Sequence, residues 1–291
     1  MEFPSRSPSE MIAILHAIAD SMFTLGIDLP FTKYHKGLKG HEEMTAIVEE
    51  SIRVMEGHTP KDGQPIKALS RILDAEDEDG NGIDMDFIIN TVIVLLSAGY
   101  DTVSSTMDTI FHGLALNPKI WDNLRKEQRR VMERFGSDIT REALDAMVYA
   151  MAVVNEGLRA QPMVPFVFKR AEKSFELGGY QIPVGMQVIS GYGFTTRYLD
   201  GRWSDRDEFR PERFLEVGAD KMDSFAPFGM GAHLCLGKEL GLVQMLVLLV
   251  VLARDYEVRL QNPNARVEMM PFPHAEDGCM AMVHRLPSSR A

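Results

Sequence analysis

The sequence predicts a mainly α-helical fold with a small β portion. Apolar residues recur at the three- and four-residue spacing of helices through the first 160 residues. A shorter stretch, 164–193, is rich in β-branched and aromatic residues and carries turn signals. The chain has 291 residues, of which 45% are hydrophobic, and this is enough apolar material for a large core.

The helical part consists of several apolar or amphipathic segments. These predicted helices cover residues 11–26, 41–57, 85–116, 118–136 and 140–160. A loop containing Pro30, Gly37 and Gly40 is expected between the first two. Pro118 ends the long third segment, and Thr140 is a good N-cap for the fifth. One more apolar helix is expected at about Lys238–Arg254.

The β portion is predicted from turn residues and short β-branched runs. "VPFVFKRAEKSFELGGYQIPVGMQVISGYG" indicates short strands joined in hairpins. An irregular, highly charged stretch follows at 195–220. "YEVRL" and "CMAMVHRL" are expected to form closing strands.

Composition excludes several classes of protein. The net charge of −11 argues against nucleic acid as a partner, since nucleic-acid binding requires a basic surface. Two cysteines do not make a disulfide framework. No signal peptide is expected from the opening "MEFPSRSPSE", which lacks a charged head followed by an apolar stretch. Two apolar runs, 87–101 and 245–253, are expected to be buried helices, because polar residues interrupt the first and the second is shorter than the ~20 residues of a membrane span.

The segment "FGMGAHLCLG", Phe228 to Gly237, surrounds Cys235 with glycines. A lone cysteine is usually a buried apolar side chain. Here Gly229 and Gly231 leave space beside the thiol, and a helix is expected to begin just after it. A helix N-terminus stabilises a thiolate, so the pattern indicates a metal ligand beside a flat, bulky cofactor.

The segment "AGYDT", Ala98 to Thr102, is a poor helix interior within a strongly helical stretch. Gly99 costs about 1 kcal/mol relative to alanine in a helix. Thr102 can hydrogen-bond back to the carbonyl four residues earlier and loosen the turn. Gly99 would leave a dent in the helix, and the loosened turn would widen it into a groove. With the acid Asp101 and the hydroxyl of Thr102 beside it, this groove could hold O2 and pass protons.

Two further motifs supply charged residues. Glu156 and Arg159 in "EGLR" could form an exposed i,i+3 pair, worth only about 0.2–0.5 kcal/mol. "PERF", Pro211 to Phe214, supplies a third charge, Arg213, from a distant part of the chain.

Along the chain these four motifs follow one another as "AGYDT", "EGLR", "PERF" and "FGMGAHLCLG", and in that order they resemble the signature of the cytochrome P-450 superfamily of haem-thiolate monooxygenases. "FGMGAHLCLG" matches the family's haem-ligand loop F-x-x-G-x-x-x-C-x-G, "AGYDT" the oxygen-binding groove of its I helix, and "EGLR" the E-x-x-R of its K helix. The resemblance implies a single domain over residues 1–291 with the C-terminal part of the P-450 fold, helices F/G through L. It also implies that the family's N-terminal portion, including its membrane anchor and C helix, is missing, and that haem is held weakly.

The resemblance further implies haem b, iron protoporphyrin IX, with the Cys235 thiolate as axial ligand. His233 stands where the family usually has a propionate-binding arginine, and Lys169 takes a similar place. The implied cofactor-binding residues are Cys235, Phe228, His233, Gly229, Gly231, Lys169, Ala98 and Gly99. Asp101 and Thr102 are implied as catalytic residues in proton delivery. Glu156, Arg159 and Arg213 are implied as a buried structural cluster.

The implied activity is insertion of one oxygen atom from O2 into a small apolar substrate. "IDLPFTKYHKGLKG", "GLRAQPMVP" and "FELGGYQIPVG" are similar to the retinoid- and sterol-oxidising branch, which implies an isoprenoid or sterol-like substrate. Electrons would come from a reductase or ferredoxin, with Arg125, Lys126, Arg129 and Arg130 as candidates for its docking.

Two alternatives stay open. One is the group of family isomerases and dehydratases that act on peroxides, and the Asp101–Thr102 pair favours the monooxygenase over it. The other is a non-catalytic truncated remnant. Localisation is not predicted, although family members are often held at the endoplasmic reticulum membrane by an N-terminal anchor.

Overall fold

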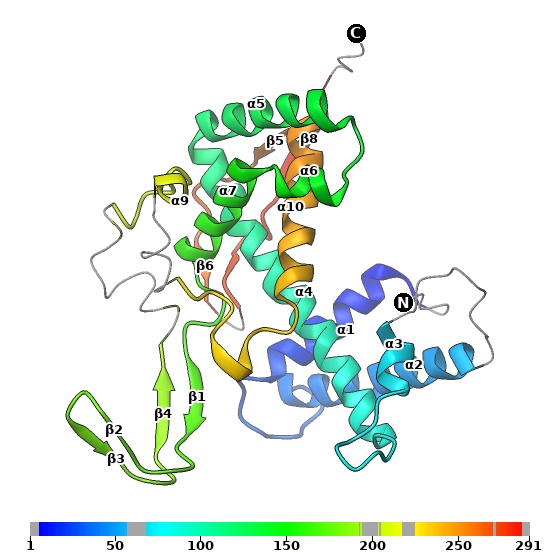
Figure 1. The fold of residues 1–291 in the computed structure, drawn as a ribbon. Helices are drawn as coiled ribbons and strands as arrows, with labels where there is room; N and C mark the ends of the chain where they lie inside the picture. The colour runs from blue at the N-terminus through cyan, green and yellow to red at the C-terminus, as the bar shows by residue number, and fades with distance from the viewer. Residues whose placement is uncertain are drawn as a thin grey trace. The chain divides into compact units, whose positions relative to one another are not determined.

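The computed structural model describes residues 6–56, 68–191, 193, 203, 205–216, 225–269 and 272–286. It confirms the mainly α-helical class with a small β portion (Figure 1). The chain forms two compact units, Met1–Asp101 and Thr102–Ala291, and the boundary falls within one long helix. Each unit has its own buried apolar cluster, so each is described by itself.

Unit 1 contains α1 (Pro8–Ser21), α2 (Lys33–Glu56), α3 (Ala68–Leu73) and the first part of α4 (Met85–Leu116). A capping box starts α1, because the Ser7 and Glu10 side chains each accept a hydrogen bond from the other's backbone N–H. The core of the unit joins all four helices and consists of Met11, Ile14, Leu15, Met44, Ile47, Val48, Ile52, Leu69, Ile89, Val92 and Ile93.

The predicted loop with Gly37 and Gly40 is partly wrong, because α2 begins at Lys33 and includes both glycines. They are needed where α2 packs on α1. A Cβ at Gly37 would overlap the Ser21 side chain, and one at Gly40 would come within 3.3 Å of the Ile14 carbonyl oxygen. The glycines that suggested a loop in the sequence therefore permit close helix packing.

Unit 2 contains the rest of α4, α5 (Pro118–Phe135), α6 (Arg141–Asp145), α7 (Val148–Ala160), α9 (Arg213–Glu216) and α10 (Lys238–Asp255). The single helix predicted over 140–160 is wrong, because it is divided into α6 and α7. The carboxylate of Glu127, on α5, accepts hydrogen bonds from the backbone N–H groups of Tyr149 (2.5 Å) and Ala150 (2.9 Å). This contact caps the start of α7 from another helix.

The β portion consists of antiparallel pairs, as predicted for the hairpins and closing strands. In unit 2, β1 (Val167–Arg170) pairs with β4 (Gln187–Ser190), β2 (Phe175–Leu177) with β3 (Tyr180–Ile182), β5 (Tyr256–Leu260) with β8 (Ala281–Arg285), and β6 (Val267–Glu268) with β7 (His274–Ala275). The irregular stretch predicted at 195–220 lies outside the described residues except for 203 and 205–216.

Two glycines allow close contacts with α4 in unit 2. A Cβ on Gly157, in α7, would overlap the Ile110 side chain of α4. A Cβ on Gly113, in α4, would overlap the ring of Phe209. These contacts fix α7 and the segment before α9 against one helix.

The helix α4 is long and apolar enough to cross a membrane, although core helices of soluble proteins meet the same criterion. In unit 1 it supplies Ile89, Val92 and Ile93 to the core, and in unit 2 it supplies Met107, Ile110 and Leu114. The helix α4 thus contributes apolar side chains to both cores, although only 28% of its apolar window is buried.

Candidate functional site

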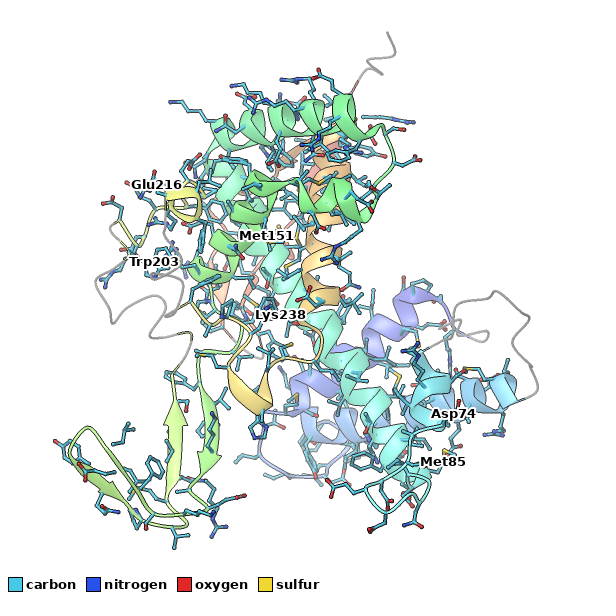
Figure 2. All side chains as sticks on the ribbon, in the orientation of Figure 1. Asp74, Met85, Met151, Trp203, Glu216 and Lys238 are labelled. Carbon is cyan, nitrogen blue, oxygen red and sulfur yellow. The ribbon has the colours of Figure 1, made fainter. Side chains whose placement is uncertain are left out.

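Cys235 lies in the loop that leads into α10, whose first residue, Lys238, is labelled in Figure 2. The backbone N–H of Cys235 donates to the carbonyl oxygen of Phe228 at 2.9 Å and so closes the loop. Phe228 packs against the apolar core of unit 2. The loop is therefore anchored at Phe228, while Cys235 itself is exposed at the N-terminus of α10.

The two cysteines differ sharply in environment. Burial, aided by the nearby Asp108 carboxylate, raises the pKa of Cys279 to about 12, so its thiol stays protonated. Cys235 is instead exposed, in the loop that leads into α10. Of the two cysteines, Cys235 is therefore the one whose sulfur is accessible to a ligand.

Glycines keep the space beside the loop open. Gly229 and Gly231 have φ angles of 76° and 73°, a region that favours glycine. A Cβ added to Gly231, in the short 3₁₀ helix Gly231–His233, would meet nothing within 4 Å. The space beside Gly231 is therefore not filled by any of the described residues, and a ligand could occupy it.

Exposed apolar residues stand near Cys235 in the loop and at the start of α10. They are Met230, Leu234, Leu236 and Leu240, and Leu236 is 86% exposed. Such a cluster on a protein surface marks a site that another group covers. A flat apolar group placed over the loop would bury these side chains, and His233 is exposed in the same loop.

A separate cavity of about 300 Å³ lies between α6, α7, α9 and α10. Its lining is mostly aliphatic and includes Leu144, Met151 and Leu246. Because Cys235 does not line it, this cavity is distinct from the loop site.

The structure brings Glu156, Arg159 and Arg213 together as a buried cluster. The Glu156 carboxylate accepts hydrogen bonds from Arg159 at 2.8 and 2.9 Å, and Arg213 Nε lies 3.1 Å from Glu156 Oε2. The three side chains are at most 2% exposed. The cluster thus joins α7 to α9.

Backbone groups around α9 complete this cluster. The N–H of Arg210 donates to Glu156 at 2.8 Å, and the Glu208 carbonyl accepts from both Arg159 and Arg213. Trp203 packs beside α9, with its ring 5.3 Å from that of Phe214 (Figure 2). Both arginines are therefore tied to the segment that precedes α9.

The residues of "AGYDT" lie on α4, which is continuous through them. Ala98 and Gly99 are exposed, and a Cβ on Gly99 would meet nothing within 4 Å. Asp101 is only 8% exposed, and burial raises its pKa, an effect opposed by His16. Ala98, Gly99 and Asp101 belong to unit 1, whereas Thr102 and the Cys235 loop belong to unit 2.

Lys169 and the basic residues of α5 lie elsewhere in unit 2. Lys169 is half-buried on β1, opposite Val188 of β4. Arg125 is half-buried, and its guanidinium donates to the Tyr256 carbonyl at 3.1 Å. In contrast, three of the four basic side chains of this run are exposed: Lys126, Arg129 and Arg130.

No local pattern in the sequence indicates the polar network that supports α7. Tyr149 donates from its hydroxyl to Glu212 at 2.7 Å, and Glu127 caps the same helix. Burial raises the pKa values of both Tyr149 and Glu127. These partners are far apart in the chain, so no local spacing could reveal them.

Comparisons with known proteins identify the family of this chain. The family model described as Cytochrome P450 matches residues 9–280. The chain is 29% identical to Cytochrome P450 26A1 of Gallus gallus over 278 residues, covering 94% of this chain and 56% of that protein. It is 28% identical to Ent-kaurenoic acid oxidase 1 of Hordeum vulgare over 297 residues, covering 98% and 58%.

A solved structure, "Retinoic acid bound cyanobacterial CYP120A1", shares the fold with a TM-score of 0.86. The match covers 98% of this chain and 65% of that chain at 24% identity. The chain thus spans little more than half the length of the curated relatives named above. Because the family model covers nearly all of the sequence, the chain belongs to the cytochrome P450 family.

Proposed function

We propose that this chain carries the haem-thiolate centre of a monooxygenase, with Cys235 as the axial ligand of haem b. The observation that supports this most is the exposed Cys235 in the loop that leads into α10, which also carries the open Gly231 and the exposed Leu234 and Leu236. Thiolate-bound haem supplies the chemistry that inserts one oxygen atom of O2 into a C–H bond and releases the other as water. The chain forms one P450 domain in this proposal.

The protein's own residues have distinct tasks in this proposal. Phe228 packs beside the cofactor, and Gly229 and Gly231 leave room for it. His233 and Lys169 pair with its propionates; the imidazole and the ammonium would act as hydrogen-bond donors and charges without the fork geometry of arginine.

On α4, Ala98 and Gly99 are exposed and would leave the helix surface open to a ligand. Thr102 would offer its hydroxyl as a hydrogen-bond donor, and Asp101 would hold and release a proton. A carboxyl with a raised pKa is suited to that task, since its pKa lies closer to neutral pH. The Glu156–Arg159–Arg213 cluster has a structural task, holding the segment before α9 against α7.

The proposed substrate is a small apolar molecule of isoprenoid or sterol-like chemistry. The name of ent-kaurenoic acid oxidase refers to an isoprenoid acid. The solved structure of CYP120A1 holds retinoic acid, which is also an isoprenoid acid. Val164 and Phe166, just after α7, are exposed apolar residues that could contact such a substrate. The exposed basic side chains of α5, Lys126, Arg129 and Arg130, are the proposed contact for a reductase or ferredoxin.

The cofactor proposal is tested by adding haem to the purified chain, reducing it and binding CO. We expect the absorption band of thiolate-ligated haem, and we expect Cys235→Ala to abolish it. Cys279→Ala is the matched control, since it removes the other cysteine and is expected to keep the band. A chain that takes up no haem, or a spectrum unchanged in Cys235→Ala, would overturn the proposal.

A further inference from the structure

The cavity between α6, α7, α9 and α10 has no task in the proposed function. Its volume is about 300 Å³, and all of its lining residues belong to unit 2. This volume is about twice the ~150 Å³ of a protein cavity that takes up benzene, and it lies at the lower end of the range for ligand pockets. The cavity is therefore large enough for a molecule with one aromatic ring and a short side chain.

The cavity has a buried apolar floor and a rim that reaches solvent. On the floor, Met147 and Leu246 are 1% and 3% exposed. Met151, labelled in Figure 2, lines the cavity from α7 and is half-buried. At the rim, Val148 and Leu215 are 60% and 47% exposed. A ligand can therefore enter from solvent and place an apolar body on the floor.

The apolar lining favours an aromatic body. Phe214, from α9, packs with Trp203 and Phe225 at centroid distances of 5.3 and 4.9 Å, so its ring is held in place. Aromatic rings pair favourably with one another. Methionine side chains adapt their shape, and their sulfur atoms make favourable contacts with aromatic rings. A ring in the cavity could therefore make specific contacts with Phe214, Met147 and Met151.

The polar groups of the lining favour a positive charge on the ligand. The charged lining residues are Arg141, Asp145 and Glu239, all exposed at the rim. Arg141 pairs with Asp145 at 3.0 Å, whereas Lys238 Nζ comes only to 4.0 Å from Glu239. Glu239 is therefore the carboxylate that is least matched. Asn155 is half-buried in the lining, and its side chain makes no hydrogen bond with the described residues.

We propose that this cavity binds a small aromatic amine, with its ring on the apolar floor and its ammonium group at the Glu239 carboxylate. The ammonium group donates hydrogen bonds to Glu239 and to the amide oxygen of Asn155. The net charge of −11 agrees with a cationic ligand, because it attracts cations to the protein. The site includes none of the residues assigned to haem, so it does not depend on the proposed function.

The test uses the full chain without added haem, with carbon-13 in the methionine methyl groups. The probe is 2-phenylethylamine, which is protonated at neutral pH as lysine is. We expect saturable NMR shifts of the Met147 and Met151 methyl signals. The signal of Met282, which is 48% exposed on β8 and outside the lining, should stay unchanged. Absent shifts at Met147 and Met151, or a Met282 shift that follows the same curve, would overturn the site.

The charge of the probe is tested with 2-phenylethanol, which has the same ring and chain but no charge. We expect it to bind about threefold more weakly, the effect of one exposed ion pair. Equal affinities for the amine and the alcohol would overturn the assignment of an amine.

Two variants locate the contacts. Glu239→Gln should weaken binding of the amine about threefold and leave the alcohol unaffected, because only the amine uses the carboxylate. Glu176→Gln is the matched control, since it removes an exposed carboxylate on β2, outside the lining, and should change neither affinity. Val243→Phe fills the cavity and should abolish the shifts with both probes. Wild-type affinities in Val243→Phe would overturn the cavity as the site, and an unchanged affinity for the amine in Glu239→Gln would overturn the contact with Glu239.

Discussion

The Glu156 cluster and the Cys235 loop lie in the same unit and are built in opposite ways. In the cluster every charged side chain is buried, and the Glu156 carboxylate is met by two guanidinium groups and a backbone N–H. In the loop the thiol is exposed, and the leucines beside it face solvent. The cluster finds its partners within this chain, whereas the loop presents a surface that fits a group from outside. Structural and functional motifs can thus be told apart by whether their polar and apolar groups are already matched.

The largest loss of stability is expected from Glu156→Gln. The substitution leaves Arg159 and Arg213 buried without a counter-charge, and removing one member of a buried charge cluster costs about 3–5 kcal/mol. The free energy of unfolding from urea denaturation, followed by circular dichroism, measures this loss.

The matched control is Arg141→Gln, which breaks the exposed pair with Asp145 at 3.0 Å. Exposed pairs contribute about 0–1 kcal/mol, so the control should change little. Equal losses in the two variants would contradict the view that the cluster is the main structural charge contact.

Gly157→Ala is expected to be the next most damaging substitution. The new Cβ would overlap the Ile110 side chain where α7 crosses α4, and such overpacking costs about 1–3 kcal/mol. The measurement is a double-mutant cycle with Ile110→Ala, which removes the overlapping atoms. The double variant should lose less stability than the sum of the single losses, and strict additivity would count against the overlap.

Gly231→Ala tests the loop side of the comparison. Its positive φ makes alanine cost roughly 1–2 kcal/mol, yet its Cβ meets no protein atom within 4 Å. We therefore expect a modest loss of stability together with a clear loss of haem affinity, measured by haem titration. Gly136→Ala is the control, because Gly136 also has a positive φ and open surroundings but ends α5. If both variants bound haem equally well, the clearance at Gly231 would have no role in binding.

The sequence predicted what depends on local spacing. The helices, the hairpins and the closing strands follow from periodicity and turn residues, and Glu156 and Arg159 are one helical turn apart. What it missed depends on distant contacts. Turn residues predict a loop at Gly37, although this glycine allows α2 to pack on α1, and the start of α7 is capped by Glu127 from α5. Local patterns carry no information about such partners.

The smallest expected change in stability is that of Asp101→Asn. Asp101 is a second buried carboxyl, so it can be compared with Glu156. Burial raises the pKa of Asp101 in the folded chain, so the folded state keeps a proton that the unfolded state has already lost. Stability therefore falls as the pH rises from the unfolded value of about 3.9 through the folded pKa. Asp101→Asn should be more stable than the wild type at pH 8, and the difference should shrink toward pH 4 in urea denaturation.

The exposed Asp122→Asn is the control for this prediction and should change stability little at either pH. If Asp101→Asn were instead destabilising at pH 8, the carboxylate would contribute to the fold as Glu156 does. A gain in stability would mean that the chain carries Asp101 at a cost to folding. Residues that break a local rule in this way are expected at functional sites, and a proton-carrying role on α4 gives a physical reason for keeping this one.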